Sequence, residues 1–320
     1  MNVQSAWRGY WFKDTPYFDL AFLRILLVGL QCFLMLSKTF GELSYVVGLD
    51  DMLYSPLLVF RFLMSPWGAH MRPDADWMNV IFWLTLACGG FSFFGLLTNL
   101  SMILFAVGNI FIQSYIYSFG DFHHPEAVMM IALLAFALSP CGKVLSIDGA
   151  IRKRRVVGTA PVVYLLDYCG PYAGWPIKFM QWFFPLMYLS AITAKMGHGS
   201  LDWANGFTLQ YYMVHDSLRK GGDLALALAF SRHHDLIAFG QMVVLVFQAT
   251  FFLVVPFPKL RWIYLPIGLL FHFGNYWILA ADFPQWIGLY AVFIPWSRVF
   301  RWVATARVVS DRTDLRPVSR

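Results

Sequence analysis

Residues 79–119 read NVIFWLTLACGGFSFFGLLTNLSMILFAVGNIFIQSYIYSF, a stretch without a single charged side chain. A membrane-spanning helix needs about 17–25 mostly apolar residues, and this stretch holds two such lengths. The polar pair Thr98 and Asn99 divides it, which predicts helices at 79–97 and 99–119 joined by a tight hairpin. The stretch therefore indicates a helical membrane protein that crosses the bilayer more than once.

The composition of the whole chain supports this class. Hydrophobic residues make up 59%, charged residues only 13%, and the mean hydropathy is +0.58. A soluble globule of 320 residues would need more polar surface than this. The first 17 residues lack an apolar core followed by a cleavage site, so we expect the first apolar helix to act as an uncleaved insertion signal.

Further apolar runs bring the predicted number of spans to about eight. Two shorter apolar pieces, 53–64 and 224–230, are expected to lie at the interface. We therefore predict an all-α, polytopic membrane bundle, in which residues 1–320 form one membrane domain with short terminal tails. Besides the hairpin, the predicted spans are 18–37, 125–138, 175–195, 236–257, 262–281 and 284–296.

Lysine and arginine are distributed unevenly between the predicted loops, and an excess of them marks the cytoplasmic side. The run RKRR at 152–155 and the arginines from Arg298 onward fall on the same side as both termini, so we predict both termini inside. Most histidines and carboxylates then lie on the outer face. The net charge of +6 reflects this asymmetry, and no basic run interleaved with aromatic residues suggests nucleic-acid binding. The four cysteines include no Cys-x-x-Cys pair, and no disulfide is expected.

The stretch at 188–206, YLSAITAKMGHGSLDWANG, contains the most informative charge in the chain. Lys195 ends an uncharged run that begins at Phe179, and Asp-Trp-x-x-Gly follows it after a short turn. An ionisable side chain at that depth is costly and suggests a functional site. A lysine at a helix end also snorkels to the headgroups, so a structural role stays open.

Other polar residues inside apolar runs have two interpretations. His272 and Asn275 are three residues apart and share a helix face. They need partners within the bundle, and an interhelical hydrogen bond alone would explain them. Arg24 is expected to snorkel or to pair with Asp19 or Asp148.

The histidine pairs at 123–124 and 233–234 have side chains that suit zinc. Neither pair has the His-Glu-x-x-His or cysteine-rich spacing of an established zinc motif. We therefore expect no metal site.

Four separated stretches share the order and spacing of a known family. They are FDLAFLRILLVG from Phe18, ALLAFALSPCGKVLSIDG after the histidine pair at 123–124, AITAKMGHGSLDWANG around Lys195, and GLLFHFGNYWIL around His272. Together they resemble the HTTM domain, the membrane portion shared by vitamin K-dependent gamma-carboxylase and its bacterial relatives. The resemblance covers about residues 18–300 and favours the bacterial cytoplasmic membrane as the location.

The resemblance implies roles for particular residues. Lys195 matches the lysine that deprotonates a reduced quinone. In the family, oxygen then converts the quinone into a stronger base, which removes the gamma proton of a glutamate. The resulting carbanion captures carbon dioxide. His124 and His272 match histidines that orient a substrate or bond a quinone oxygen. We further expect Asn275, Trp203 and Asp202 to contribute to cofactor binding.

Two classes of function follow. The leading hypothesis is a gamma-carboxylase-like lyase in the lipid bilayer, which acts at the outer face on a quinone resembling vitamin K hydroquinone, with Lys195 as general base. The alternative is a non-catalytic membrane factor that helps to mature, bind or export a small peptide, with Lys195 structural. A transporter is less favoured, because the predicted spans show no internal repeat.

Overall fold

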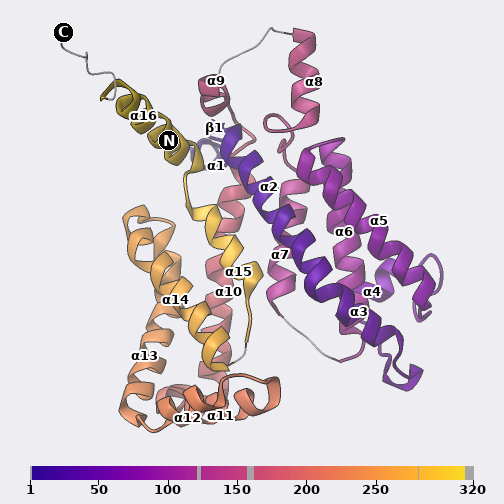
Figure 1. The fold of residues 1–320 in the computed structure, drawn as a ribbon, viewed down its shortest axis with the longest axis vertical. Helices are drawn as coiled ribbons and strands as arrows, with labels where there is room; N and C mark the ends of the chain where they lie inside the picture. Colours follow the sequence, from indigo (N-terminus) through magenta and orange to yellow (C-terminus); the bar gives the residue numbers. More distant parts are fainter. Residues whose placement is uncertain (1, 121–123, 157–161, 280, 314–320) are drawn as a thin grey trace, which may run out of the picture. The chain divides into compact units, whose positions relative to one another are not determined.

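The computed structural model describes residues 2–120, 124–156, 162–279 and 281–313; it is 79% helical and has almost no strands. The chain divides into two compact units (Figure 1). Unit 1 comprises Met1–Lys178 and Ile294–Arg320, and unit 2 comprises Phe179–Phe293. The sequence analysis identified no boundary at these positions.

Unit 1 is built on four helices that pack on one another: α2, α5, α6 and α7 (Figure 1). A two-stranded antiparallel ribbon, β1 with β2, lies before α2 and pairs Thr15 with Gly170. The described elements of unit 1 are α1 (Val3–Trp11), β1 (Thr15–Pro16), α2 (Tyr17–Leu34), a π-helical turn (Met35–Thr39), α3 (Phe40–Val47), a 3-10 turn (Asp51–Leu53), α4 (Leu58–Met64), α5 (Ala75–Phe94), α6 (Thr98–Tyr117), α7 (His124–Ala137), α8 (Ile147–Val156), α9 (Val162–Asp167), β2 (Cys169–Gly170) and α16 (Trp296–Thr313).

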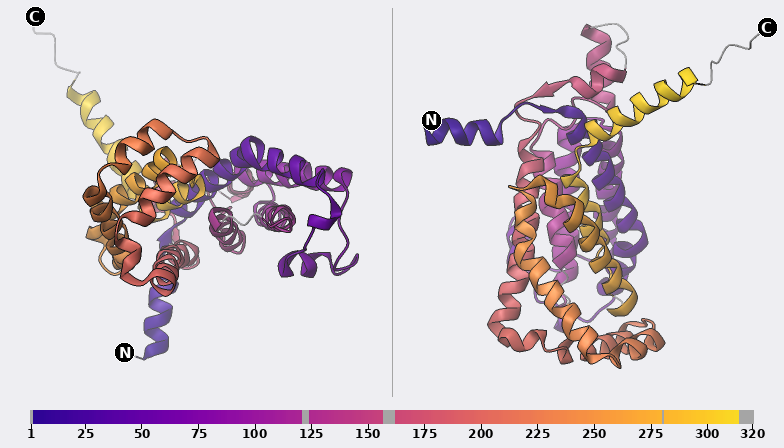
Figure 2. Two further views of the ribbon diagram at one scale, coloured as in Figure 1. Left: turned by 90° about the horizontal axis from the view of Figure 1, so that it is seen from below. Right: turned by 90° about the vertical axis from the view of Figure 1, so that its left-hand side faces the viewer.

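Unit 2 consists of helices in two orientations. The helices α13 and α14 run alongside each other, and α11 and α12 lie across their ends (Figure 2). The described elements, beginning with α10, which enters from unit 1, are α10 (Trp175–Gly199), a 3-10 helix (Ser200–Ala204), α11 (Phe207–Lys220), α12 (Leu224–Ser231), α13 (His234–Thr250), 3-10 turns at Phe251–Val254 and Pro258–Leu260, α14 (Arg261–Leu279), α15 (Pro284–Leu289) and a 3-10 turn (Tyr290–Phe293).

Four helical segments in the described part of the chain are long and apolar enough to cross a membrane. They are Tyr17–Val47, Ala75–Phe94, Thr98–Tyr117 and His234–Val254. The helical membrane character predicted from the sequence is thus supported by length and composition for four spans, and the total of eight stays a prediction. The predicted span at 284–296 is not one helix, because α15 gives way to a 3-10 turn and then to Pro295.

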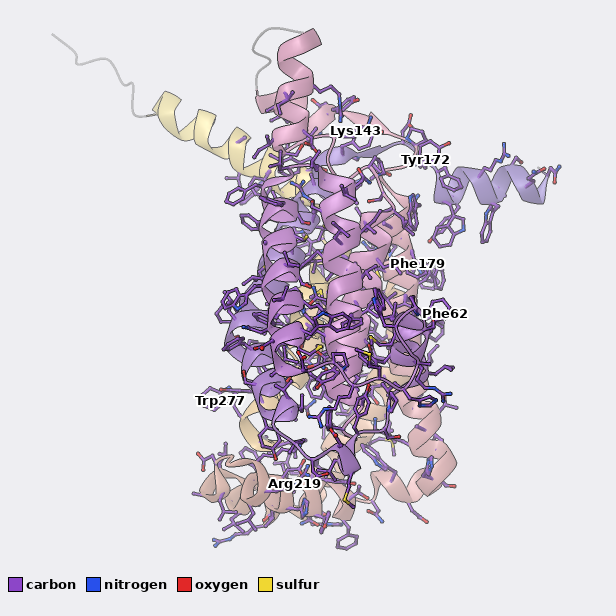
Figure 3. The ribbon with its side chains drawn as sticks, turned by 90° about the vertical axis from the view of Figure 1, so that its right-hand side faces the viewer. Phe62, Lys143, Tyr172, Phe179, Arg219 and Trp277 are labelled. Carbon is purple, nitrogen blue, oxygen red and sulfur yellow. The ribbon has the colours of Figure 1, made fainter. Side chains whose placement is uncertain are left out.

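Large apolar side chains also point outward from helices outside these four segments. The Phe62 side chain of α4 is 76% exposed, and Trp277 of α14 is 61% exposed and points away from its helix (Figure 3). Exposed aromatic and aliphatic surface of this extent suits contact with lipid tails and headgroups.

The first spanning segment is longer than predicted. The sequence predicts its end at Ser37, but the helix continues through a π-helical turn to Val47. Lys38, within that turn, approaches the buried Glu126 of α7 at 3.3 Å, and Tyr117 donates to the same carboxylate at 2.9 Å. A charge that meets its partner inside the helical bundle does not have to end the helix.

The hairpin between α5 and α6 also differs from its prediction. The turn is not at Thr98 and Asn99 but three residues earlier, because Gly95 ends α5 with a left-handed φ of 71°. Asp148 then caps α6: its carboxylate accepts the backbone N–H groups of Leu97 at 3.0 Å and Thr98 at 2.7 Å, and the Thr98 hydroxyl at 2.7 Å. The Ser-x-Asp-Gly segment is therefore a remote N-cap for a spanning helix.

Arg24 does not snorkel, contrary to one expectation, and of the two carboxylates expected to pair with it Asp148 attracts it electrostatically without forming a close ion pair. Its side chain is fully buried, and Nη2 donates to the carbonyl of Leu145 at 2.5 Å. Asp19 instead caps α16 by accepting the backbone N–H of Ser297. Within the described residues the Nε and Nη1 groups of Arg24 have no hydrogen-bond partner, so this guanidinium is held by packing, one carbonyl and the electrostatic attraction of Asp148.

Candidate functional site

A cavity of about 440 Å³ lies within unit 2. Five elements line it: α10, the 3-10 helix after it, α11, α13 and α14. Most of the wall is apolar, and a few polar groups interrupt it, which is the usual make-up of a small-molecule site. The lining residues are Lys195, Trp203, Thr208, Leu209, Tyr212, Met213, Asp216, Gly240, Gln241, Val244, Phe271, Gly274, Asn275, Ile278 and Leu279.

Lys195 is the basic residue of this pocket. It lies in the last turns of α10, which runs four residues further than predicted, to Gly199. Its Nζ donates to Oε1 of Gln248 at 2.8 Å and lies 5.0 Å from the centre of the Trp203 ring. Among the described residues no carboxylate lies within ion-pairing distance of Nζ, so the amine is balanced only by a neutral amide and an aromatic face.

Two side-chain amides also contribute polar groups to the wall. Gln241 of α13 is fully buried; its Nε2 donates to the carbonyl of Trp203 at 2.8 Å, and its Oε1 has no partner within the described residues. Asn275 of α14 also lines the pocket. A buried acceptor without a donor is costly, so Gln241 Oε1 is a natural place for a ligand hydroxyl or N–H.

Asp216 is the acidic residue of the lining. Lys220 donates to it at 2.9 Å and His215 Nδ1 lies 3.1 Å away. Burial raises the pKa of this carboxyl, but the hydrogen bonds from Lys220 and His215 outweigh burial and hold the pKa below its ordinary value. Asp216 is thus an ionised group whose carboxylate is already hydrogen-bonded by Lys220 and His215 of the same helix, α11.

His272 is placed differently from Asn275, although the two share α14. Its Nε2 lies 2.9 Å from the Tyr188 hydroxyl, which in turn lies 2.6 Å from the hydroxyl of Tyr290. The imidazole is surrounded by aromatic rings, among them Trp286, and it does not line the pocket. An interhelical hydrogen bond, one of the two interpretations offered by the sequence, is therefore present.

Of the two neighbouring residues expected to bind a cofactor, one lines this pocket and the other does not. Asp202 is exposed in the 3-10 helix, while its neighbour Trp203 forms part of the wall. His124 begins α7 in unit 1, but its side chain, like all of His123, lies outside the described residues. Among the described histidines, His234 bonds to Gln210 at 2.9 Å, and no group of three metal-ligating side chains occurs in this part of the chain.

Sequence reasoning missed Gln241 and Gln248. Both lie in the predicted span at 236–257, seven residues apart, and therefore on one face of the helix about two turns from each other. Polar amides on one face of an apolar span indicate partners inside the bundle, a signal that could have placed them beside Lys195. No family model, curated protein or solved structure matches this chain. The site is accordingly assigned from its own geometry.

Proposed function

We propose that this chain is a membrane enzyme of the gamma-carboxylase-like class, which binds a lipophilic molecule with an acidic hydroxyl, such as a reduced quinone, in the unit 2 pocket. Lys195 is the general base. The observation that carries the proposal is an amine in an apolar-walled pocket with no carboxylate at ion-pairing distance among the described residues. The resemblance of AITAKMGHGSLDWANG to the carboxylase segment supports the same role.

The residues present fit such a ligand. Leu209, Val244, Phe271 and Ile278 supply apolar walls for a ring or an isoprenoid chain. The free acceptor on Gln241 suits a ring hydroxyl. A cavity of about 440 Å³ is within the usual range for small-molecule sites. When bound, a reduced quinone would supply the electrons and, after deprotonation and reaction with molecular oxygen as the oxidant, the base that the carboxylase reaction requires.

Proton transfer is the step that the residues of this chain carry out. Taking an amine out of water disfavours its charged form, so Lys195 Nζ is available to accept a proton from a neighbouring hydroxyl. Gln248 fixes the position of Nζ through the 2.8 Å bond from Nζ to its Oε1, and Trp203 stabilises the ammonium that forms after transfer. Gln241 Oε1 orients the ligand by accepting from its second polar group.

The test compares Lys195→Met with wild type in lipid nanodiscs. Turnover of a supplied menaquinol, read as quinol oxidation and as incorporation of labelled bicarbonate into a glutamate-containing peptide, should fall by at least about 100-fold. Bound quinone, measured by mass spectrometry, should change little. Lys259→Met, which removes an exposed lysine outside the pocket, is the matched control and should keep full activity.

Full activity of Lys195→Met would overturn the assigned role. A different result would favour the alternative. If wild type binds no quinone but forms a stable complex with a secreted peptide, and Lys195→Met leaves that complex unchanged, the chain is the non-catalytic peptide factor that the sequence also allows.

A further inference from the structure

A second cavity lies in unit 1 and has the opposite character. Its volume is about 590 Å³, and four basic side chains line it: Lys13, Lys178, Arg298 and Arg301. They come from three separate segments of the chain, the N-terminal ribbon region, the first turn of α10, and α16. Folding therefore gathers these charges, which the sequence does not place together.

Two of these cations already have partners. Lys178 donates to the backbone carbonyl of Tyr10 and lies 5.2 Å from the centre of its ring. Arg301 pairs with Asp167 at 2.6 Å. The side chains of Lys13 and Arg298 form no hydrogen bond or ion pair with any described residue.

The acidic residues of the lining do not cancel this charge. Asp19 accepts from both the N–H and the hydroxyl of Ser297, at 2.5 and 3.2 Å, so its oxygens are occupied by the α16 cap. Asp14 is exposed. With Asp14 and Asp19 counted against the four cations, the lining still carries an excess of two positive charges, of which Asp167, the partner of Arg301, offsets one.

The position of the cavity identifies the partner. Pro16, which lines it, directly precedes Tyr17, the first residue of the longest spanning segment, so the cavity opens where a span leaves the hydrocarbon. The helices on either side of it are aromatic and exposed: Trp7 on α1 is 62% exposed and Trp302 on α16 is 73% exposed. Exposed tryptophans beside basic residues are typical of segments that rest in the headgroup layer.

We propose that this basic pocket binds the phosphate of an anionic phospholipid headgroup. Lys13 and Arg298 contact the phosphate oxygens, Lys178 and Arg301 border them, and α1 and α16 lie in the interface around the lipid. Arginine and lysine are the side chains that suit phosphate, and headgroup recognition by basic pockets next to spanning helices has this composition.

The experiment uses the full chain, purified in a neutral detergent, with lipid binding read by native mass spectrometry and by the thermal unfolding midpoint. Phosphatidylglycerol should bind and raise the midpoint, whereas phosphatidylcholine and inorganic phosphate at the same concentration should not. The double variant Lys13→Gln/Arg298→Gln should bind phosphatidylglycerol about 10- to 30-fold more weakly. Lys143→Gln/Lys259→Gln removes two exposed charges outside the pocket and should bind like wild type.

Equal binding of the two lipids, or an unchanged affinity in the pocket variant, would overturn the proposal. Protection by inorganic phosphate equal to that by phosphatidylglycerol would make this a free-phosphate site and would also overturn it. If the double glutamine variant does not fold, the single variants Lys13→Gln and Arg298→Gln decide the question, because each should weaken phosphatidylglycerol binding and an unchanged affinity in both would overturn the proposal.

Discussion

A single carboxylate, Asp148, organises the end of two spanning helices. Its oxygens satisfy two backbone N–H groups at the start of α6, and its own N–H donates to the carbonyl of Gly95 at 3.0 Å, at the end of α5. The first N–H groups of a helix have no partner in the helix itself, so this remote cap replaces water. The tight hairpin depends on a residue about fifty positions downstream.

The pH dependence of stability follows from this cap and from Asp216. Burial raises the pKa of each carboxyl, but hydrogen bonds to Asp148 from Thr98 and Leu97, and to Asp216 from Lys220, outweigh it, so both pKa values lie below the ordinary 3.8. Because the folded pKa values are depressed, this stabilisation is fully present above about pH 4 and is lost as pH falls through the folded values.

Thermal unfolding in detergent between about pH 6 and pH 3 should show this loss, with a midpoint that falls on acidification. The Asp148→Asn/Asp216→Asn variant should be less stable at neutral pH and nearly flat across the same range. Asp76→Asn, an exposed carboxylate without a described partner, should follow wild type. An acid transition of equal size in the double variant would contradict the assignment.

At the scale of single residues, some of the site could be predicted. Lys195 stands out because a charge in an apolar run has few explanations, and Trp203 follows it closely in the sequence. The partners could not be predicted: Gln248 is 53 residues from Lys195, and Tyr188 is 84 residues from His272. Contacts at that separation depend on how helices pack, which periodicity does not determine.

Among the elements, α14 depends on close approach to a neighbouring aromatic segment. A Cβ added at Gly268 would lie 2.0 Å from the hydroxyl oxygen of Tyr290. That hydroxyl also bonds to Tyr188, which carries the bond to His272. The missing side chain at Gly268 is therefore what allows the tyrosine pair and the histidine to meet.

Gly268→Ala should consequently destabilise unit 2 by about 1–3 kcal/mol, because the tyrosine must move and the hydrogen-bonded group loses its geometry. The measurement is the unfolding midpoint in detergent. Gly197→Ala on α10, where a Cβ would meet nothing within 4 Å, should be neutral or slightly stabilising. Equal effects of the two substitutions on the unfolding midpoint would show that the close approach of Gly268 to Tyr290 does not contribute to stability.

Element boundaries were predictable only where sequence signals are local. The apolar character of α5, α6 and α13 is visible in the sequence, and α5 and α6 lie close to their predicted ranges. The first span is longer than predicted because a charged residue, Lys38, indicates the end of an apolar helix in the sequence, whereas its partner Glu126 becomes apparent only in the folded bundle. The hairpin turn lies earlier than predicted because the chain turns at Gly95, which has a left-handed φ, whereas the polar residues that indicate a turn in the sequence are Thr98 and Asn99.

For the whole molecule, the predicted orientation can be tested with the native cysteines. Cys169 is exposed, whereas Cys141 is buried and Cys32 and Cys88 are partly buried. If both termini are inside, a membrane-impermeant maleimide should label Cys169 only after cells are opened. The thiol will react slowly, because burial and nearby carboxylates raise its pKa, so labelling is best done at alkaline pH.

The matched variant is Arg219→Cys in a Cys169→Ser background. Arg219 is exposed at the end of α11 and belongs to the predicted outer face (Figure 3). It should be labelled in intact cells. Labelling of Cys169 in intact cells, with protection of position 219, would reverse the orientation.

The length of the first helical segment has a mechanical consequence. Tyr17–Val47 is 31 residues long, which at helical rise is about 47 Å, against a hydrocarbon thickness of about 30 Å. Counted from Tyr17, about 30 Å brings the helix to the π-helical turn, where Lys38 supplies its first charge after Arg24. On this count α3 lies beyond the hydrocarbon, where it packs on α5 and α6 and Arg72 donates to the carbonyl of Val47 at 2.8 Å, so a tilt of α2 in the bilayer has to carry these neighbouring helices with it.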